Sequence, residues 1–343
     1  MPKSHGSLLT DTVPRLQHTM VDMTSPFRRR TLTSVAATSL LIVALACSAN
    51  DDTSPTATSV PPTSVPQPTP LLPTPPPGDA SDLRVVLAST DLAVGRNRLA
   101  FGILEGAAGQ LRAAEANILL FHVDTSQNEP RARAMGKFVA WPTGRNGVYV
   151  AIVEFDAPGR WGIVAEIVGA DGNVRRAQSS VFQVNAAASS PAIGQPAPAS
   201  VTKTSADVAG LAEITTSQEP DPDLYRITVA QAIASGIPTV VTFATPAFCQ
   251  TATCGPQVEV VEAMKERFGP RANFIHVEVY ENPNEIEGDL SKLRLAPAMT
   301  EWGLLTEPFT FVIDGQGLVA AKFEGFVTEG ELEAALAATL GGP

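Results

Sequence analysis

The sequence predicts an all-β domain followed by an α/β domain, both behind a targeting segment and a disordered tether. Three observations support this prediction. Short β-branched runs alternate with turn residues in residues 81–185, and strand and helix patterns alternate in residues 201–343. Pro, Thr and Ser dominate residues 48–80, which have almost nothing to bury. A chain of 343 residues is long enough for two such domains.

Residues 1–47 are typical of a targeting segment. Arg28–Arg30 are followed by the apolar run VAATSLLIVALA at residues 35–46, which is too short to span a bilayer comfortably. The end of this run, Ala-Leu-Ala-Cys47, resembles a bacterial lipobox with alanine where leucine is commonest. The resemblance implies that Cys47 is lipidated and that the chain is an extracytoplasmic lipoprotein of a bacterial cell membrane. The alternative is a plain signal peptide, in which case the protein is secreted.

Residues 48–80 directly follow Cys47, where a membrane tether belongs. Such a composition cannot offset its ordering entropy and predicts an extended spacer. The formal charge of the whole chain is −11. An acidic chain is a poor match for a phosphate backbone, so nucleic acid is not expected as a partner.

The all-β prediction for residues 81–185 depends on six short runs with turn chemistry between them. The runs are Leu83–Ala88, Asn97–Leu104, Ala116–Val123, Gly147–Phe155, Gly162–Val168 and Gln178–Val184. Turn residues at 156–159 and 171–172 separate several of them. Regular short strands of this kind predict an antiparallel β-sandwich.

The run Val148–Ile167 resembles the end of immunoglobulin-like extracytoplasmic modules of the YtkA/FixH type, which implies an immunoglobulin-like sandwich. Trp141 and Trp161 are expected in or beside its core. His122 has no Cys, Met or His neighbour at ligand spacing, so a structural role is expected.

Residues 186–200 are rich in Ala, Pro and Ser and predict a second linker before the α/β domain. The domain at 201–343 then alternates strands and helices. The expected elements are a helix at 229–235, a strand at 239–245, a helix at 256–268, a strand at 273–280, an irregular or helical stretch at 284–303, strands at 309–313 and 318–323, and a helix at 328–340. Helices on both faces of this sheet would explain its nearly continuous apolar strands.

The candidate site is the stretch between the first strand and the second helix of this domain. It holds Cys249 and Cys254, two of the three cysteines, in a C-x4-C spacing. Residues five apart in an ideal helix rise about 7.5 Å along its axis, which exceeds the usual Cα separation of a disulfide. Cys249 is therefore expected in the loop and Cys254 at the helix start, where unpaired N–H groups favour a thiolate.

Further residues carry a resemblance to the thioredoxin-like oxidoreductases of the TlpA type. The cysteine stretch ends in Cys254-Gly-Pro256, and Glu307-Pro308 opens a strand that leads to the turn Asp-Gly-Gln-Gly317. The segment Ile193–Pro198 also resembles the entry of such domains. The resemblance implies that Pro308 is cis, faces the cysteines and positions a substrate thiol with its backbone. The C-x4-C spacing departs from the C-x-x-C of thioredoxins, which leaves open which cysteine is the nucleophile.

The resemblance implies thiol–disulfide exchange with protein thiols and disulfides of the cell envelope, by a monomer without cofactor or metal. In the rival interpretation, the two cysteines form a structural disulfide in a non-enzymatic surface adaptor. A copper-delivering relative of the SCO type would need C-x3-C and a distal histidine, and no histidine follows His276. The pattern Pro246-x4-Thr251-x2-Cys254 differs by one residue from that of peroxiredoxins.

Overall fold

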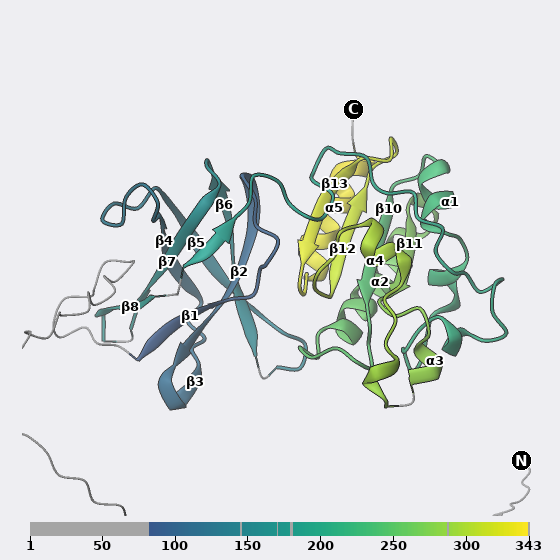
Figure 1. Cartoon of the computed structure of the whole chain (residues 1–343), viewed down its shortest axis with the longest axis horizontal. Coiled ribbons are helices and arrows are strands. Elements are labelled where there is room, and N and C mark those ends of the chain that lie inside the picture. The colour runs from purple at the N-terminus through teal and green to yellow at the C-terminus, as the bar shows by residue number, and fades with distance from the viewer. Residues whose placement is uncertain (1–81, 145, 170, 179–180, 287, 342–343) are drawn as a thin grey trace, which may run out of the picture. The chain divides into compact units, whose positions relative to one another are not determined.

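The computed structural model describes residues 82–341 except 145, 170, 179–180 and 287 (Figure 1). The predictions for residues 1–47, including lipidation of Cys47, and for the tether at 48–80 lie outside these residues. None of the described helices is long and apolar enough to cross a membrane.

The all-β part has nine strands in one sheet. The strands are β1 (Leu83–Leu87), β2 (Gly95–Glu105), β3 (Gly109–Gln110), β4 (Glu115–His122), β5 (Ala132–Ala140), β6 (Gly147–Phe155), β7 (Gly159–Val168), β8 (Val174–Gln178) and β9 (Phe182–Val184). A short 3₁₀ turn, Gly106–Ala108, joins β2 to β3.

This sheet closes on itself, which corrects the prediction of a sandwich of two sheets. Its strand order is β1-β8-β7-β4-β5-β6-β2-β3, and β1 also pairs with β2. The β1–β2 pairing is antiparallel over the whole of β1, whereas β1 meets β8 in parallel at Arg84 and Gln178. The result is a barrel-like sheet. Strand periodicity could not show this closure, because closure depends on which distant strands pair.

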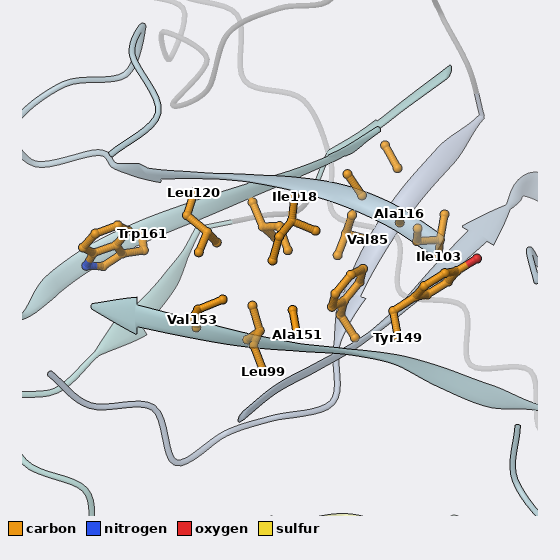
Figure 2. Packing of buried hydrophobic residues seen from close by; sticks show 14 of the residues in the cluster. Val85, Leu99, Ile103, Ala116, Ile118, Leu120, Tyr149, Ala151, Val153 and Trp161 are labelled. Carbon is orange, nitrogen blue, oxygen red and sulfur yellow. The ribbon is translucent and has the colours of Figure 1, made fainter. Parts of the chain in front are cut away.

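The interior of the barrel-like sheet holds its hydrophobic core (Figure 2). Along β4, Ala116, Ile118 and Leu120 are buried and Asn117 is exposed, the period of two that a half-buried strand requires. Trp161 on β7 is fully buried, as predicted, and its indole N–H donates to the carbonyl of Ala157. Trp141 is only partly buried.

Two strand predictions differ from the structure. β5 was not predicted, because its Arg133 and Lys137 interrupt the apolar pattern, yet it pairs with both β4 and β6. The single strand predicted at 178–184 is wrong, since β8 ends at Gln178 and β9 begins at Phe182. His122 is held inside the domain, with Nδ1 contacting the Thr125 hydroxyl and Nε2 the Pro158 carbonyl.

The α/β part is built on a four-stranded sheet of order β11-β10-β12-β13. Its strands are β10 (Thr239–Ala244), β11 (Asn273–Glu278), β12 (Phe309–Ile313) and β13 (Val319–Glu324). The α-helices are α1 (Val229–Ala234), α2 (Cys254–Phe268), α3 (Pro283–Ile286), α4 (Pro297–Glu301) and α5 (Glu329–Leu340). Short 3₁₀ turns lie at Leu211–Glu213, Pro222–Tyr225, Gly269–Arg271 and Leu290–Lys292.

Helices cover both faces of this sheet, as the continuous apolar strands predicted. All six residues of β10 are buried, and they alternate between two cores. Val240 and Ala244 pack with residues of α2 and α5, whereas Val241 and Phe243 pack with residues of α1 and α4. β10 is parallel to β11 and antiparallel to β12. β10 therefore lies inside the sheet, and the cysteine loop follows its C-terminal end.

Two local predictions in this domain are confirmed. Thr328 caps α5, with its hydroxyl accepting from the Glu331 N–H and the Glu331 carboxylate accepting from the Thr328 N–H. The hairpin between β12 and β13 turns at Asp314–Gly317, where Gly317 adopts φ 79°. Residues 194–197, predicted as linker, make backbone hydrogen bonds with residues 317 and 319.

Candidate active site around the cysteine pair

The two cysteines form a disulfide between the end of β10 and the start of α2. Cys249 lies in the loop, Cys254 is the first residue of α2, and their Cα atoms are 5.9 Å apart. This is the arrangement that the C-x4-C spacing predicted. Cys254 is completely buried, whereas Cys249 is partly exposed. A substrate sulfur can therefore reach Cys249 more easily than Cys254.

The first turn of α2 begins two residues before the predicted start at Pro256. Pro256 is the third helical residue, where its missing N–H costs no hydrogen bond because the first four helical N–H groups are unpaired. The first α-helical bond at this end runs from Gln257 N–H to the Thr253 carbonyl. The free N–H groups and the helix dipole favour negative charge at the two sulfurs when they are reduced.

Threonine hydroxyl groups make contacts within the loop between the cysteines. The Thr251 hydroxyl lies 3.3 Å from the Cys249 sulfur and 2.7 Å from the Thr253 hydroxyl. Ala252 adopts φ 56°, a left-handed conformation that costs a residue with a Cβ about 1–2 kcal/mol. The described part of the chain has no other non-glycine residue with positive φ.

Pro308 lies beside the cysteines, and the Glu307–Pro308 peptide bond is cis. The register of β10 and β12 places Phe309 opposite Phe243, so Pro308 stands near the strand end that leads into the cysteine loop. The Glu307 carboxylate joins the two segments: its Oε2 accepts from the Thr245 N–H at 2.8 Å and lies 3.7 Å from the Cys254 sulfur. The structure thus brings together Cys249, Cys254 and Pro308.

Glu307 is a site residue that sequence reasoning missed. Burial raises its pKa to about 7, with a further contribution from the nearby charge of Glu278 and an opposing one from the Thr245 N–H. A carboxyl group with this proton affinity, in contact with a sulfur, can accept or return a thiol proton near neutral pH. The signal in the sequence was an acidic residue directly before the proline that opens a buried strand.

His276 lies close to this region in a structural role. Its Nδ1 contacts the Tyr225 hydroxyl at 2.7 Å, its Nε2 contacts the Ala244 carbonyl, and complete burial lowers its pKa to about 4. A neutral imidazole with both nitrogens engaged holds β10, β11 and the 222–225 turn together. No group of three or more metal-ligating side chains occurs among the described residues.

No family model and no curated protein matches the chain. Similar solved structures include a thiol:disulfide interchange protein of the thioredoxin family from Chlorobium tepidum, at 15% identity, covering 34% of this chain and 88% of that one, with a TM-score of 0.28. A DsbF homologue from Corynebacterium diphtheriae is 14% identical over 40% of this chain and 99% of its own, with a TM-score of 0.26.

The structure of DsbF from MTB, in mixed oxidised and reduced forms, is 20% identical, covers 33% of this chain and 87% of that one, and has a TM-score of 0.25. Of these three names, the first refers to thiol:disulfide interchange and to the thioredoxin family.

Proposed function

We propose that the protein is an extracytoplasmic, membrane-anchored thiol–disulfide oxidoreductase that acts through Cys249 and Cys254. The observation that carries this proposal is the disulfide at the start of α2, with one partly exposed sulfur and one buried sulfur in contact with Glu307. A cysteine pair at a helix start has a stabilised thiolate, and the thiolate is the reactive form.

The exposure of the two sulfurs supports Cys249 as the attacking cysteine and Cys254 as the resolving one. In the reduced protein the Cys249 thiolate attacks a substrate disulfide, the substrate S–S bond breaks, and one substrate sulfur leaves as a thiolate that takes a proton from water. Cys254 then gives its proton to Glu307 and attacks the Cys249 sulfur. The mixed disulfide breaks, the second substrate thiolate leaves, and two electrons have passed from the protein to the substrate. The reverse sequence oxidises a substrate dithiol.

Pro308 would guide the substrate in this scheme. Its backbone flanks the cysteine loop, so an extended substrate segment can align its sulfur with Cys249. The chemistry takes place between sulfur atoms and a carboxyl group, so it needs no cofactor or metal. The substrates would be thiols and disulfides of cell-envelope proteins, and the protein would act as a monomer without nucleic acid.

The N-terminal part would hold this activity at a membrane. Lipidation of Cys47 would anchor the chain, residues 48–80 would act as a spacer, and the folded domains at 81–185 and 201–343 would extend from it. Replacing Cys47 by serine should move the protein from the membrane fraction to the soluble fraction. Retention of the Cys47→Ser variant in the membrane fraction would contradict lipid anchoring at this residue.

A structural disulfide in a non-enzymatic adaptor is the second candidate. The complete burial of Cys254 favours it, because a buried disulfide partner often serves only to clamp a loop. The two candidates differ in what happens when one sulfur is removed. An exchange site keeps its fold and loses turnover, whereas a clamp loses stability.

Single-cysteine variants in a Cys47→Ser background test the proposal, because that background leaves only the pair itself. With oxidised glutathione, Cys254→Ser should accumulate a mixed disulfide at Cys249, since the resolving sulfur is gone. Cys249→Ser, the matched control, should form far less adduct because its remaining sulfur is buried. Equal adduct formation by the two variants, or none in either, would favour the adaptor.

A further inference from the structure

A second buried carboxyl group lies next to Glu307. Glu278 ends β11, and its charge contributes to the raised pKa of Glu307. Its own side chain is almost completely buried, and burial raises its pKa as well. Two like charges close to each other, one of them buried, cannot both form easily, so the protonation of each acid depends on the other.

Threonine side chains connect the two carboxyl groups. Glu278 Oε2 accepts from the Thr216 N–H at 2.8 Å and from the Thr216 hydroxyl at 2.9 Å. The Thr216 hydroxyl lies 3.4 Å from the Thr245 hydroxyl, and Thr245 donates its N–H to Glu307. Thr245 therefore connects the two acids, since its N–H binds Glu307 and its hydroxyl lies beside the Thr216 hydroxyl that binds Glu278.

Glu278 also lines a cavity of about 190 Å³ that opens to the surface of the domain. Tyr225, His276 and Tyr280 line it as well, and its described lining includes neither cysteine nor Pro308. Glu278 thus borders this cavity, whereas Glu307 does not line it.

Other titratable groups lie near the pair. Burial and the charges of both acids raise the pKa of Tyr280, and burial and the charge of Glu278 raise the pKa of Tyr225, which contacts His276. Lys203, Glu281 and Glu301 line the same cavity.

We propose that Glu278 is a positioning residue for the exchange reaction, which sets the pH range in which Glu307 accepts the proton of Cys254. The inference rests on the proposed function. In the resolving step the Cys254 S–H bond breaks, its proton moves to Glu307, and the freed electron pair attacks the Cys249 sulfur. The bond between Cys249 and the substrate sulfur breaks, and the substrate sulfur leaves as a thiolate. The negative charge of an ionised Glu278 makes Glu307 a stronger base for this step. The proton then leaves to solvent from Glu307, whose side chain is partly exposed.

The test is the pH dependence of oxidation of the reduced Cys47→Ser protein by oxidised glutathione, followed by thiol trapping between pH 5 and 9. The parent protein should show an inflection near pH 7. Glu278→Gln removes the neighbouring charge, so the inflection should fall by about one pH unit. Glu278→Asp should restore it most of the way. The control Glu281→Gln removes an acid that lines the same cavity and should leave the inflection unchanged.

A Glu278→Gln profile that superimposes on the parent, or an equal shift in Glu281→Gln, would overturn the inference. Should Glu278→Gln not fold, Thr216→Val serves instead. It removes a hydroxyl that stabilises the ionised Glu278, so it should shift the inflection in the same direction, and an unchanged profile would overturn the inference.

If the proposed oxidoreductase function is wrong, the measurements differ from those expected when only the role of Glu278 is wrong. The parent protein would not react with oxidised glutathione at any pH. The coupling between the acids would still be visible in the oxidised protein, as a change of the Glu307 carboxyl titration by NMR on replacement of Glu278. That result would leave the carboxyl pair intact as a structural feature and remove its role in exchange.

Discussion

Replacing Glu307 by glutamine should stabilise the oxidised protein at pH 8 and leave its stability unchanged at pH 4. The pKa of Glu307 is about 7 in the folded chain against an ordinary value of 4.5. The folded state therefore binds a proton that the unfolded state has released between these values, so the free energy of unfolding falls as the pH rises from 4.5 to 7. Glutamine keeps the shape and an acceptor for the Thr245 N–H, and has no charge to desolvate.

The size of this effect follows from the pKa difference. About 2.5 pH units correspond to about 3.4 kcal/mol, and screening at this partly exposed side chain reduces the expected value to about 2 kcal/mol. Urea unfolding at both pH values, with the disulfide intact, measures it. Glu281→Gln is the control and should show no such difference between the two pH values.

Because His276 also titrates, the free energy of unfolding of the wild type must be subtracted from that of the Glu307→Gln variant at each pH. The pKa of His276 is lowered to about 4, so its contribution to stability is lost as the pH falls from 6.5 to 4, opposite in sign to that of Glu307. The wild-type curve contains both effects, and the subtraction removes that of His276. An equal change at pH 4 and pH 8, or destabilisation at pH 8, would refute the burial argument for Glu307.

Three further substitutions test the packing and the local geometry. Trp161→Ala should lower the free energy of unfolding by about 3–5 kcal/mol, because it removes a large, fully buried side chain from the core of the barrel-like sheet, and a loss below about 1 kcal/mol would contradict that placement. Ala252→Gly should stabilise the oxidised protein by up to about 1 kcal/mol in urea unfolding, because glycine adopts a left-handed φ without the cost that Ala252 bears, whereas the β-branched Ala252→Val should destabilise it; equal effects would argue against φ 56°. Thr328→Ala should lower the free energy of unfolding by about 1 kcal/mol, because α5 loses its N-cap, whereas Thr328→Ser should retain most of the stability; thermal unfolding measures both.

The α/β domain was predictable because its signals are local. Continuous apolar strands such as β10, a capping box at Thr328 and turn residues at 314–317 each specify their own stretch of chain. The cysteine spacing also restricted the geometry, since residues five apart on a helix cannot form a disulfide. The start of α2 at Cys254 was therefore predictable to within two residues.

The closure of the all-β domain and the acids at the site were not predictable from the sequence, for one physical reason. Pairing of β1 with both β2 and β8 depends on contacts between residues far apart in the chain, which no periodicity shows. Glu278 and Glu307 are 29 positions apart in the sequence and become neighbours only when β11 and β12 pair with opposite edges of β10. Burial then changes their proton affinity, and burial is a property of the folded chain.

The reduction potential of the Cys249–Cys254 disulfide tests the central claim most directly. It is measured on the Cys47→Ser chain by equilibration with glutathione or dithiothreitol, followed by thiol trapping, so that only this pair contributes. A working oxidoreductase should have a potential between about −120 and −270 mV, and the value would also separate an oxidant from a reductant. A potential below about −300 mV would mark a structural disulfide and would contradict the proposed function.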